Sequence, residues 1–283
     1  MGRNKENGAK RVSIRAALAA CACIAVIAPL AAISATPKDQ LPGGTYDSIK
    51  KLPDWSGMWA PGRPPADASA EDKQGYAKGI FGEGIPLAPK YAKARDERLK
   101  AVTGQLGLDK IPLSNSGFCV PTGEPAVMGE VSHEYLFSPG RVTLALENGE
   151  SRKIWTDGRG HPSEDVSNPS FSGHSIGHWE GDTLVVDTVD IFPEAEIYMG
   201  GYVTAKTHIV ERFTRVGNKM RIRTVITDPD LLEKPWVFTR WYDREDREPV
   251  DYERCTLEDR VKKAGPNLGG IDFNLNRDSG DKK

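Results

Sequence analysis

The sequence predicts a mainly β protein: an antiparallel up-and-down barrel or a strongly curved sheet of about eight strands, preceded by a helix and a loop segment. Two observations support this fold class. Between residues 133 and 243 the chain is a series of short runs rich in β-branched and aromatic residues. Turn-forming residues separate several of these runs: Pro-Gly at 139–140, Asn-Gly-Glu at 148–150, Gly-Asp at 181–182 and Gly-Asn at 217–218.

Eight segments fit the pattern of strands: residues 133–139, 141–148, 151–157, 174–180, 183–189, 208–216, 219–228 and 235–243. Consecutive hairpins imply a meander. Eight such strands can close into a lipocalin-like or calycin-like barrel, which has no exposed edge and can hold one small ligand. The alternative is an open curved sheet with the N-terminal helix over one face. The loop at 158–172 has a length that is often associated with function.

The segment before the sheet contains one predicted helix. Pro89 is followed by good helix formers and then by Gly104, which predicts a helix over residues 89–104. Residues 52–65 are rich in aromatic residues, and the Gly57-x-Trp59 spacing is like that of the first strand of lipocalin-like barrels.

The N-terminus predicts export. Residues 1–15 are basic, residues 16–33 are apolar and uncharged, and the small residues Ser34 and Ala35 follow. This order is typical of a Sec-type signal peptide spanning 1–35, so we expect a periplasmic or secreted protein. The alternative is an uncleaved membrane anchor. We expect a flexible linker at 36–51, a single β-rich domain at 52–265 and a polar tail at 266–283.

Charge and cysteines limit the partners of the mature chain. The whole chain has a net charge of −2 and residues 1–35 carry +4, so −6 remains after cleavage. A mildly acidic exported domain argues against binding to nucleic acid or to a membrane surface. Cys119 and Cys255 remain in an oxidising compartment, where we expect a disulfide between them; two free thiols are the alternative.

The candidate site begins at GHSIGHWEGDTLVVDT, residues 173–188. With a two-residue turn at 181–182, the alternation of side chains puts His174, His178 and Asp187 on one face. The other face is more apolar and is the expected core, which leaves the histidines on an outer surface. If both faces are covered, a histidine beside a carboxylate is an oriented general base.

The long loop adds His161 and Asp157 to this region. We predict His161, His174, Asp157 and Asp187 as catalytic residues of an acid–base site that needs no cofactor. A metal site built from the histidines is the alternative, although their spacing matches no known motif. On a strand, His174 and His178 lie about 13 Å apart, too far to share one metal.

The last strands carry polar residues on apolar faces. Glu211 and Arg240 need partners if they are buried, most simply each other. We predict Arg240, Tyr242, Glu211, Trp236 and His178 as substrate-binding residues of a pocket suited to an aromatic or carboxylate-bearing ligand. The alternative is a structural ion pair.

Several segments of the chain resemble one protein family: IWTDGRGHP, GHSIGHWEGDTLVVDT, HIVERF and KPW, with DWSGMW upstream. The family is a broad group of secreted, largely uncharacterised bacterial proteins, and the resemblance covers roughly residues 54–257. It implies an exported single domain and brings no reaction and no catalytic residues.

These observations predict an exported β-barrel enzyme that acts on a small aromatic or hydrophobic molecule by metal-independent general acid–base chemistry, as a lyase, isomerase or hydrolase. A periplasmic carrier of a hydrophobic ligand is the alternative and would not need the histidines. An envelope interaction domain is a third reading. GHSIG at 173–177 has the letters of a nucleophile elbow, but Ser175 lies within a predicted strand and points away from His174.

Overall fold

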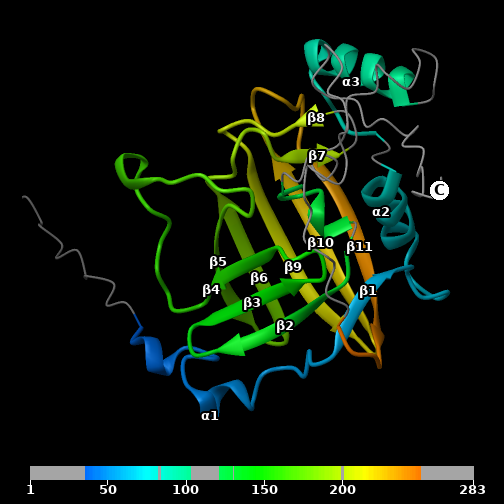
Figure 1. Cartoon of the computed structure of the whole chain (residues 1–283). Helices are drawn as coiled ribbons and strands as arrows, with labels where there is room; N and C mark the ends of the chain where they lie inside the picture. The colour runs from blue at the N-terminus through cyan, green and yellow to red at the C-terminus, as the bar shows by residue number, and fades with distance from the viewer. Residues whose placement is uncertain (1–35, 82–83, 103–120, 130, 199–200, 250–283) are drawn as a thin grey trace, which may run out of the picture. The chain divides into compact units, whose positions relative to one another are not determined.

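The computed structural model describes residues 36–81, 84–102, 121–129, 131–198 and 201–249. In this part of the chain nine strands form a closed barrel in the order β1-β11-β10-β9-β6-β5-β4-β3-β2 (Figure 1). The prediction of a mainly β fold is therefore confirmed. The barrel strands are β1 (Met58–Gly62), β2 (His133–Ser138), β3 (Arg141–Leu146), β4 (Ser151–Trp155), β5 (His174–Glu180), β6 (Thr183–Val189), β9 (His208–Val216), β10 (Lys219–Thr227) and β11 (Trp236–Glu245).

All eight predicted segments form barrel strands, and the ninth barrel strand is β1. β1 pairs with β11 on one side and with β2 on the other, and these two pairings close the barrel. Trp59 anchors β1 because its side chain is fully buried and its indole N–H donates to the carbonyl oxygen of Trp55 at 2.9 Å. A separate ribbon pairs β7 (Glu196–Tyr198) with β8 (Gly201–Tyr202).

The strand pairing differs from the predicted meander at one place. β4 and β5 run parallel, with Ile154 opposite Ser175, whereas the other barrel pairs are antiparallel. The connection at 156–173 carries the chain from the end of β4 back toward its start, where Ser172 Oγ donates to the Ser151 carbonyl at 3.1 Å. Parallel neighbours need such a long connection, so the purely antiparallel prediction is wrong at this step.

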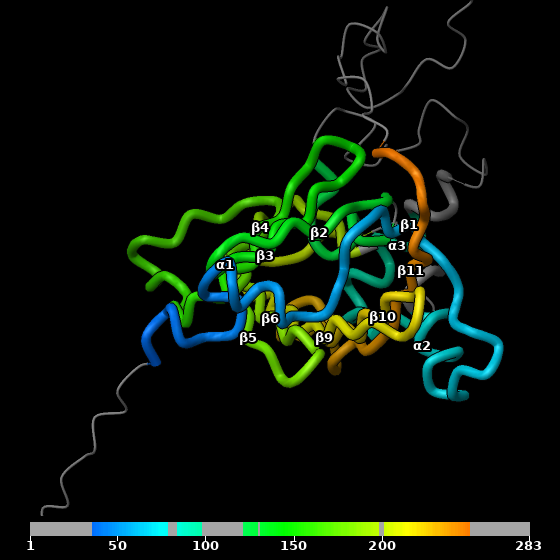
Figure 2. The backbone as a smooth tube through the Cα atoms, turned by 90° about the horizontal axis from the view of Figure 1, so that it is seen from below, coloured from blue at the N-terminus to red at the C-terminus, as the bar shows by residue number. Residues whose placement is uncertain are grey.

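Helices lie before the main run of strands. The predicted helix is confirmed as α3 (Pro89–Val102), while Gly104 lies outside the described residues. A second helix, α2 (Ala70–Phe81), was not predicted and packs along β11 (Figures 1 and 2). Gly75 permits this close approach, because an added Cβ would lie 2.8 Å from Thr239 Oγ1. Short 3₁₀ turns lie at η1 (Lys38–Gln40), η4 (Val127–Gly129) and η5 (Glu164–Val166).

The segment expected to be a flexible linker, 36–51, contains the short helix α1 (Tyr46–Ile49). Thr45 and Ser48 form a reciprocal capping box at its start. The carbonyl oxygen of Gly43 accepts a hydrogen bond from the Gly140 N–H at 2.9 Å. This last hydrogen bond attaches the segment to the turn between β2 and β3.

The barrel interior has a polar layer between two apolar clusters. Along β9, Ile209 belongs to one cluster and Phe213 to the other, and the buried Glu211 lies between them. On β10 the buried Thr224, opposite Glu211, occupies the same level. The barrel interior is therefore apolar on either side of this layer, and the layer itself contains charged side chains.

Several predicted features fall outside the described residues. They are the signal peptide at 1–35, both cysteines of the expected disulfide, Cys119 and Cys255, and the polar tail at 266–283. Among the helices that the structure describes, none has the length and apolar character needed to cross a membrane.

Candidate functional site

Asp187 lies on the outer wall of the barrel. Along β6, Val186 and Thr188 are buried inside, and Asp187 between them points outward with 41% of its side chain exposed. Across the neighbouring strands it lies opposite Ile176 and Val210. The outward direction agrees with the sequence expectation that the more apolar face of this hairpin forms the core.

Two imidazoles from separate segments contact the same oxygen of Asp187. His161, from the loop after β4, places Nε2 at 3.0 Å from Oδ1, and His208, the first residue of β9, places Nε2 at 2.8 Å. An ionised carboxylate only accepts hydrogen bonds, so both Nε2 atoms carry a proton and donate it. Each ring, when neutral, then has an unprotonated Nδ1.

His174, the first residue of β5, extends this network. Its Nδ1 lies 2.9 Å from Nδ1 of His161, and the two rings meet edge to face. Because Nδ1 of neutral His161 accepts, Nδ1 of His174 donates, and Nε2 of His174 keeps a free electron pair. Burial lowers the pKa of His174, as do the nearby His161 and Arg159, while Asp190 opposes them. His174 is therefore a neutral base at pH 7.

These four residues, His161, His174, Asp187 and His208, are called the Asp187 cluster below. Three of the five histidines of the chain meet there. Water reaches the cluster, since 22% of the His161 side chain and 41% of the His208 side chain are exposed. Pairs that water reaches contribute little to stability, so stability alone does not explain why these side chains converge.

The backbone beside the cluster is also unusual. Asp190, directly after β6, has a φ of 55°, and it is the only residue other than glycine with positive φ in the described part of the chain. Sparsely populated backbone conformations concentrate at functional sites. This observation supports a functional reading of the same region.

Asp157, which was predicted as a catalytic residue, pairs with cations instead of a histidine. Arg159 donates to it from Nε at 2.8 Å and from Nη2 at 2.7 Å, and Lys38 donates at 3.0 Å. The hydrogen bonds from Arg159 hold the pKa of Asp157 well below its usual value. Asp157 therefore orients Arg159, two residues before His161.

His178 was predicted as a substrate-binding residue and lies apart from the cluster. Its Nε2 is 3.1 Å from Oε1 of Glu180, and 67% of its side chain is exposed. It shares the outer face of β5 with His174, as predicted, and lies four residues further along the strand.

The other predicted substrate-binding residues point into the barrel. Glu211, Trp236, Arg240 and Tyr242 are each at most 4% exposed. The barrel wall therefore separates them from the Asp187 cluster, and the two predicted groups do not form one site.

The predicted pairing of Glu211 with Arg240 is wrong, because a third strand supplies the cation. Arg152 of β4 pairs with Glu211, and its Nη1 lies 3.3 Å from Oε1 of Glu124. Arg240 instead donates to the carbonyl oxygen of Pro125 at 2.7 Å. The alternation along β4 contains the signal for Arg152, since it lies on the same face as the buried Ile154.

The interior also contains titratable groups that sequence reasoning missed. Burial raises the pKa of Glu124 to about 7 although Arg152 lies nearby, and burial lowers the pKa of His133 to about 4. The His133 ring lies 4.8 Å from the rings of both Tyr135 and Tyr242. Burial raises the pKa of both tyrosines. All of these groups are buried inside the barrel and together form a polar core.

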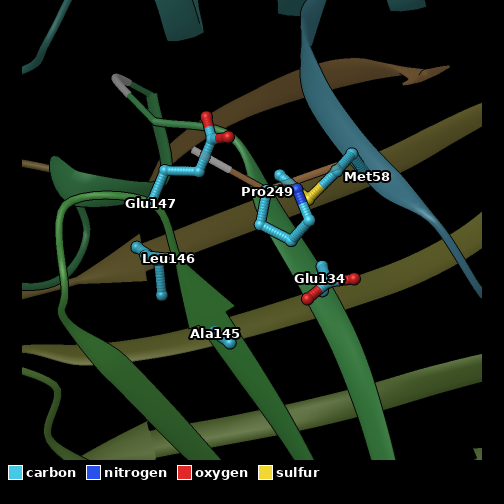
Figure 3. Close-up of a pocket in the computed structure, with 6 residues that line it drawn as sticks. All are labelled: Met58, Glu134, Ala145, Leu146, Glu147 and Pro249. Atoms are coloured by element: carbon cyan, nitrogen blue, oxygen red, sulfur yellow. The ribbon is translucent and has the colours of Figure 1, made fainter. Parts of the chain in front are cut away.

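Two surface hollows lie away from the cluster. One, of ≈ 290 Å³, is lined by Met58, Glu134, Ala145, Leu146, Glu147 and Pro249 (Figure 3). Glu147 there is paired with Arg247, and these lining residues include no histidine or nucleophile. The other, of ≈ 250 Å³, is lined by residues 49, 50 and 52–56 together with Tyr135 and Phe137. Neither set of lining residues includes a member of the Asp187 cluster.

The described residues contain no group of three or more histidine, cysteine or carboxylate side chains arranged to hold a metal ion. The ring directions give a reason. His161 directs Nε2 at Asp187 and Nδ1 at His174, so neither of its nitrogens is free to bind a metal, as a ligand of a metal site must be.

Comparison with protein-family models, with curated proteins and with solved structures finds no match to this chain. The resemblance to a family of secreted bacterial proteins therefore stays a prediction. Fold and geometry define the chain as a closed β-barrel protein that carries a histidine–carboxylate cluster on its outer wall.

Proposed function

We propose that the protein is an exported enzyme that moves protons on a small aromatic or hydrophobic molecule at the Asp187 cluster, as a lyase or isomerase. The observation that supports this most strongly is that two imidazoles contact one partly exposed carboxylate and a third imidazole contacts one of the two. Export rests on the N-terminal sequence pattern.

In this proposal His174 is the general base. Its Nε2 takes a proton from the substrate, and the charge is shared with His161 through the contact between the two Nδ1 atoms. Asp187 stabilises the resulting imidazolium through its contact with His161.

His208 is the proposed general acid. It contacts the same oxygen of Asp187 as His161 does, and when protonated it can return a proton from Nδ1. An acid–base reaction needs one group that takes a proton and another that gives one. In this proposal His174 and His208 hold these two roles.

The proton movements balance without an oxidant or reductant. In an elimination, a C–H bond next to a carbonyl group breaks as His174 takes the proton, and the electron pair forms a C=C bond. The leaving oxygen departs with the proton from His208. In an isomerisation the proton returns to a different carbon. A covalent route through Ser175 is not supported, because its hydroxyl group faces inward and contacts Arg152 and Thr188.

The wall around Asp187 favours a substrate with an apolar body. Trp155 lies opposite Ile176 in β5, Ile176 lies opposite Asp187, and Val210 lies on the other side of Asp187. These apolar side chains share the outward face with the acid–base groups. An aromatic or aliphatic part of the substrate could pack against these side chains and remove apolar surface from water.

The test is solvent deuterium exchange. The mature protein is incubated in D₂O with a panel of small aromatic ketones and β-hydroxy carbonyl compounds, and exchange or elimination is followed by NMR and mass spectrometry. We expect turnover that falls by about 100-fold or more in His174→Gln and in His208→Gln. His178→Gln is the matched control, because His178 lies on the same face of β5 and contacts Glu180.

Two results would contradict the proposal. Turnover that survives both cluster substitutions would remove the assigned roles of the histidines. A ligand that binds unchanged to the wild type and to both variants, without turnover, would favour the carrier alternative.

A chelator gives a separate check on metal independence. We expect the rate to be unchanged after dialysis against EDTA, because both ring nitrogens of His161 are engaged by His174 and Asp187 and neither is free for a metal. A rate that is lost with EDTA and restored by added Zn²⁺ would show that the cluster holds a metal instead.

A further inference from the structure

We propose that Arg159, held by Asp157 over the ring of Trp155, is an anion-binding subsite beside the Asp187 cluster, and that the substrate therefore carries a carboxylate group. The role of this subsite in catalysis rests on the proposed function above. Its ability to bind a carboxylate does not, and it can be tested separately.

Asp157 fixes the direction of the Arg159 side chain. The carboxylate accepts from Nε and Nη2 of Arg159, so one edge of the planar guanidinium is already occupied. The second edge, formed by Nη1 and the other N–H of Nη2, is left for a ligand. No hydrogen bond from Nη1 to any residue in the described ranges is present, and 38% of the side chain is exposed.

Trp155 supports the guanidinium from below. Arg159 lies over its ring at 3.8 Å from the centroid, a close cation–π distance. Arg141 of β3 lies opposite Trp155 in the strand pairing and is also placed over this ring, at 5.6 Å from the centroid. Ring and carboxylate together hold Arg159 in one position before any ligand arrives, which lowers the entropy cost of binding.

The local charge is suited to an anion. Lys38 and Arg159 both pair with one carboxylate, that of Asp157, and a third cation, Arg141, lies over the same Trp155 ring as Arg159. The low pKa of Asp157 keeps that carboxylate ionised at all moderate pH values, so the excess of positive charge does not change. A planar guanidinium edge pairs with a planar carboxylate through two parallel hydrogen bonds.

The subsite lies within the span of one small molecule from the proposed base. Arg159 is two residues from His161, so their Cα atoms are at most about 7 Å apart. Trp155 and Asp187 are separated by one intervening strand, which corresponds to about 10 Å. A small aromatic or aliphatic acid can place its carboxylate on Arg159 and its reacting carbon near His174.

Stability does not explain the arrangement. The Asp157 side chain is only 10% exposed, but 38% of the Arg159 side chain and 70% of the Lys38 side chain are exposed, so water screens both ion pairs and limits their contribution. The interior charges, by contrast, are paired because burial leaves them no alternative. An exposed guanidinium that is clamped on one edge and open on the other is better suited to binding than to folding.

The test is the binding of benzoate to the mature protein, measured by calorimetry, with benzamide as the uncharged match. We expect saturable binding of benzoate, at least tenfold weaker binding of benzamide, and at least tenfold weaker binding of benzoate in Arg159→Met. Arg212→Met is the control, because Arg212 is similarly exposed on the outer wall and pairs with Glu180. We expect Arg159→Lys, which keeps the charge but loses the planar edge, to bind with intermediate affinity.

The inference is overturned if Arg159→Met, shown to be folded by circular dichroism, binds benzoate as the wild type does. It is also overturned if benzamide binds equally well, or if Arg212→Met weakens binding as much as Arg159→Met. His174→Gln separates the two proposals, since it should abolish turnover and keep benzoate binding. Normal benzoate binding with turnover unaffected by His174→Gln would refute the proposed function alone.

Discussion

Charged side chains on the two faces of the barrel wall differ in what their pairing contributes. Inside, Arg152 is 1% exposed and compensates the buried Glu211 and Glu124. Outside, Arg212 pairs with Glu180 with nearly half of both side chains in water. Burial makes an unpaired charge costly, while water screens an exposed one. The same residue type is therefore structural on one face and free to serve binding on the other.

Removing Arg152 tests this difference. We expect Arg152→Met to destabilise the fold by about 3–5 kcal/mol, because Glu211 and Glu124 lose their buried partner. Urea unfolding measures the loss. Arg212→Met, measured in the same way, should change stability little, and equal effects of the two variants would contradict the distinction between the faces.

Glu124 gives a prediction about pH. Its pKa in the folded protein is raised to about 7 from 4.5, so between these values the folded state holds a proton that the unfolded state has released. Stability supplied by this group is present below pH 4.5 and is lost as pH rises toward 7. The lowered pKa of His133 has the opposite sign, with stability gained as pH rises from 4 to 6.5.

Glu124→Gln removes the first contribution and keeps the second. The stability of this variant minus that of the wild type should increase with pH between 4.5 and 7, by up to about 1 kcal/mol per pH unit. Chemical unfolding at several pH values measures this difference. A difference that is flat or falls with pH would show that Glu124 is ionised throughout this range in the folded protein.

Single residues of the site were predictable to different degrees. The alternation in the hairpin at 173–188 placed His174 and Asp187 on one face, and the structure confirms it. His208 was missed, although its alternation with the buried Ile209 signals an outward direction. What the sequence did not reveal was that β9 pairs with β6, which brings His208 beside Asp187.

At the scale of elements, the connection between β4 and β5 creates the site. Because these strands are parallel, the chain must return along the barrel, and the return loop carries His161 to the outer wall. Hairpin signals identify tight turns but not a parallel pairing, which depends on contacts distant in sequence. The long loop was recognised from the sequence, and its path was not.

Gly173 is the last residue of this loop, directly before β5 begins at His174. It has a φ of +65°, and an added Cβ would lie 2.8 Å from both Thr188 Cγ2 and the Val189 carbonyl oxygen. We expect Gly173→Ala to destabilise the fold by about 2–3 kcal/mol and to reduce turnover, because His174 is the next residue.

Gly181→Ala is the matched control for this substitution in urea unfolding. Gly181 also has a positive φ, +59°, but an added Cβ would have no atom within 4 Å. It should cost about 1 kcal/mol from backbone strain alone. If both variants lose the same stability, the atoms around Gly173 can move aside for the added Cβ at no cost in free energy, which would contradict this prediction.

At the scale of the whole molecule, the barrel closes through β1, and the polar interior is sealed by the wall on which the Asp187 cluster lies. The sequence predicted the number and positions of eight strands because each strand has a local pattern. Closure by β1 was less evident, since this strand is short and contains Pro61. Buried partners such as Arg152 and Glu211 come from strands far apart in sequence, so their pairing was not predictable.

Export of the whole chain is tested by its intact mass. After secretion from cells that carry the full gene, we expect mass spectrometry to show a protein that lacks residues 1–35. The mass should also be lower by two hydrogen atoms if Cys119 and Cys255 form a disulfide. A full-length product that stays with the cells would contradict export, and alkylation of both cysteines without reduction would contradict the disulfide.

The most direct test of the central claim is NMR of the histidine rings, because it needs no substrate. With ¹⁵N-labelled protein, long-range correlations should show protonated Nε2 in His161 and His208 and protonated Nδ1 in His174. Asp187→Asn should alter all three rings and leave His178 unchanged. If His161 and His208 instead show the same tautomer mixture as His178 and do not respond to Asp187→Asn, the cluster does not act as a unit.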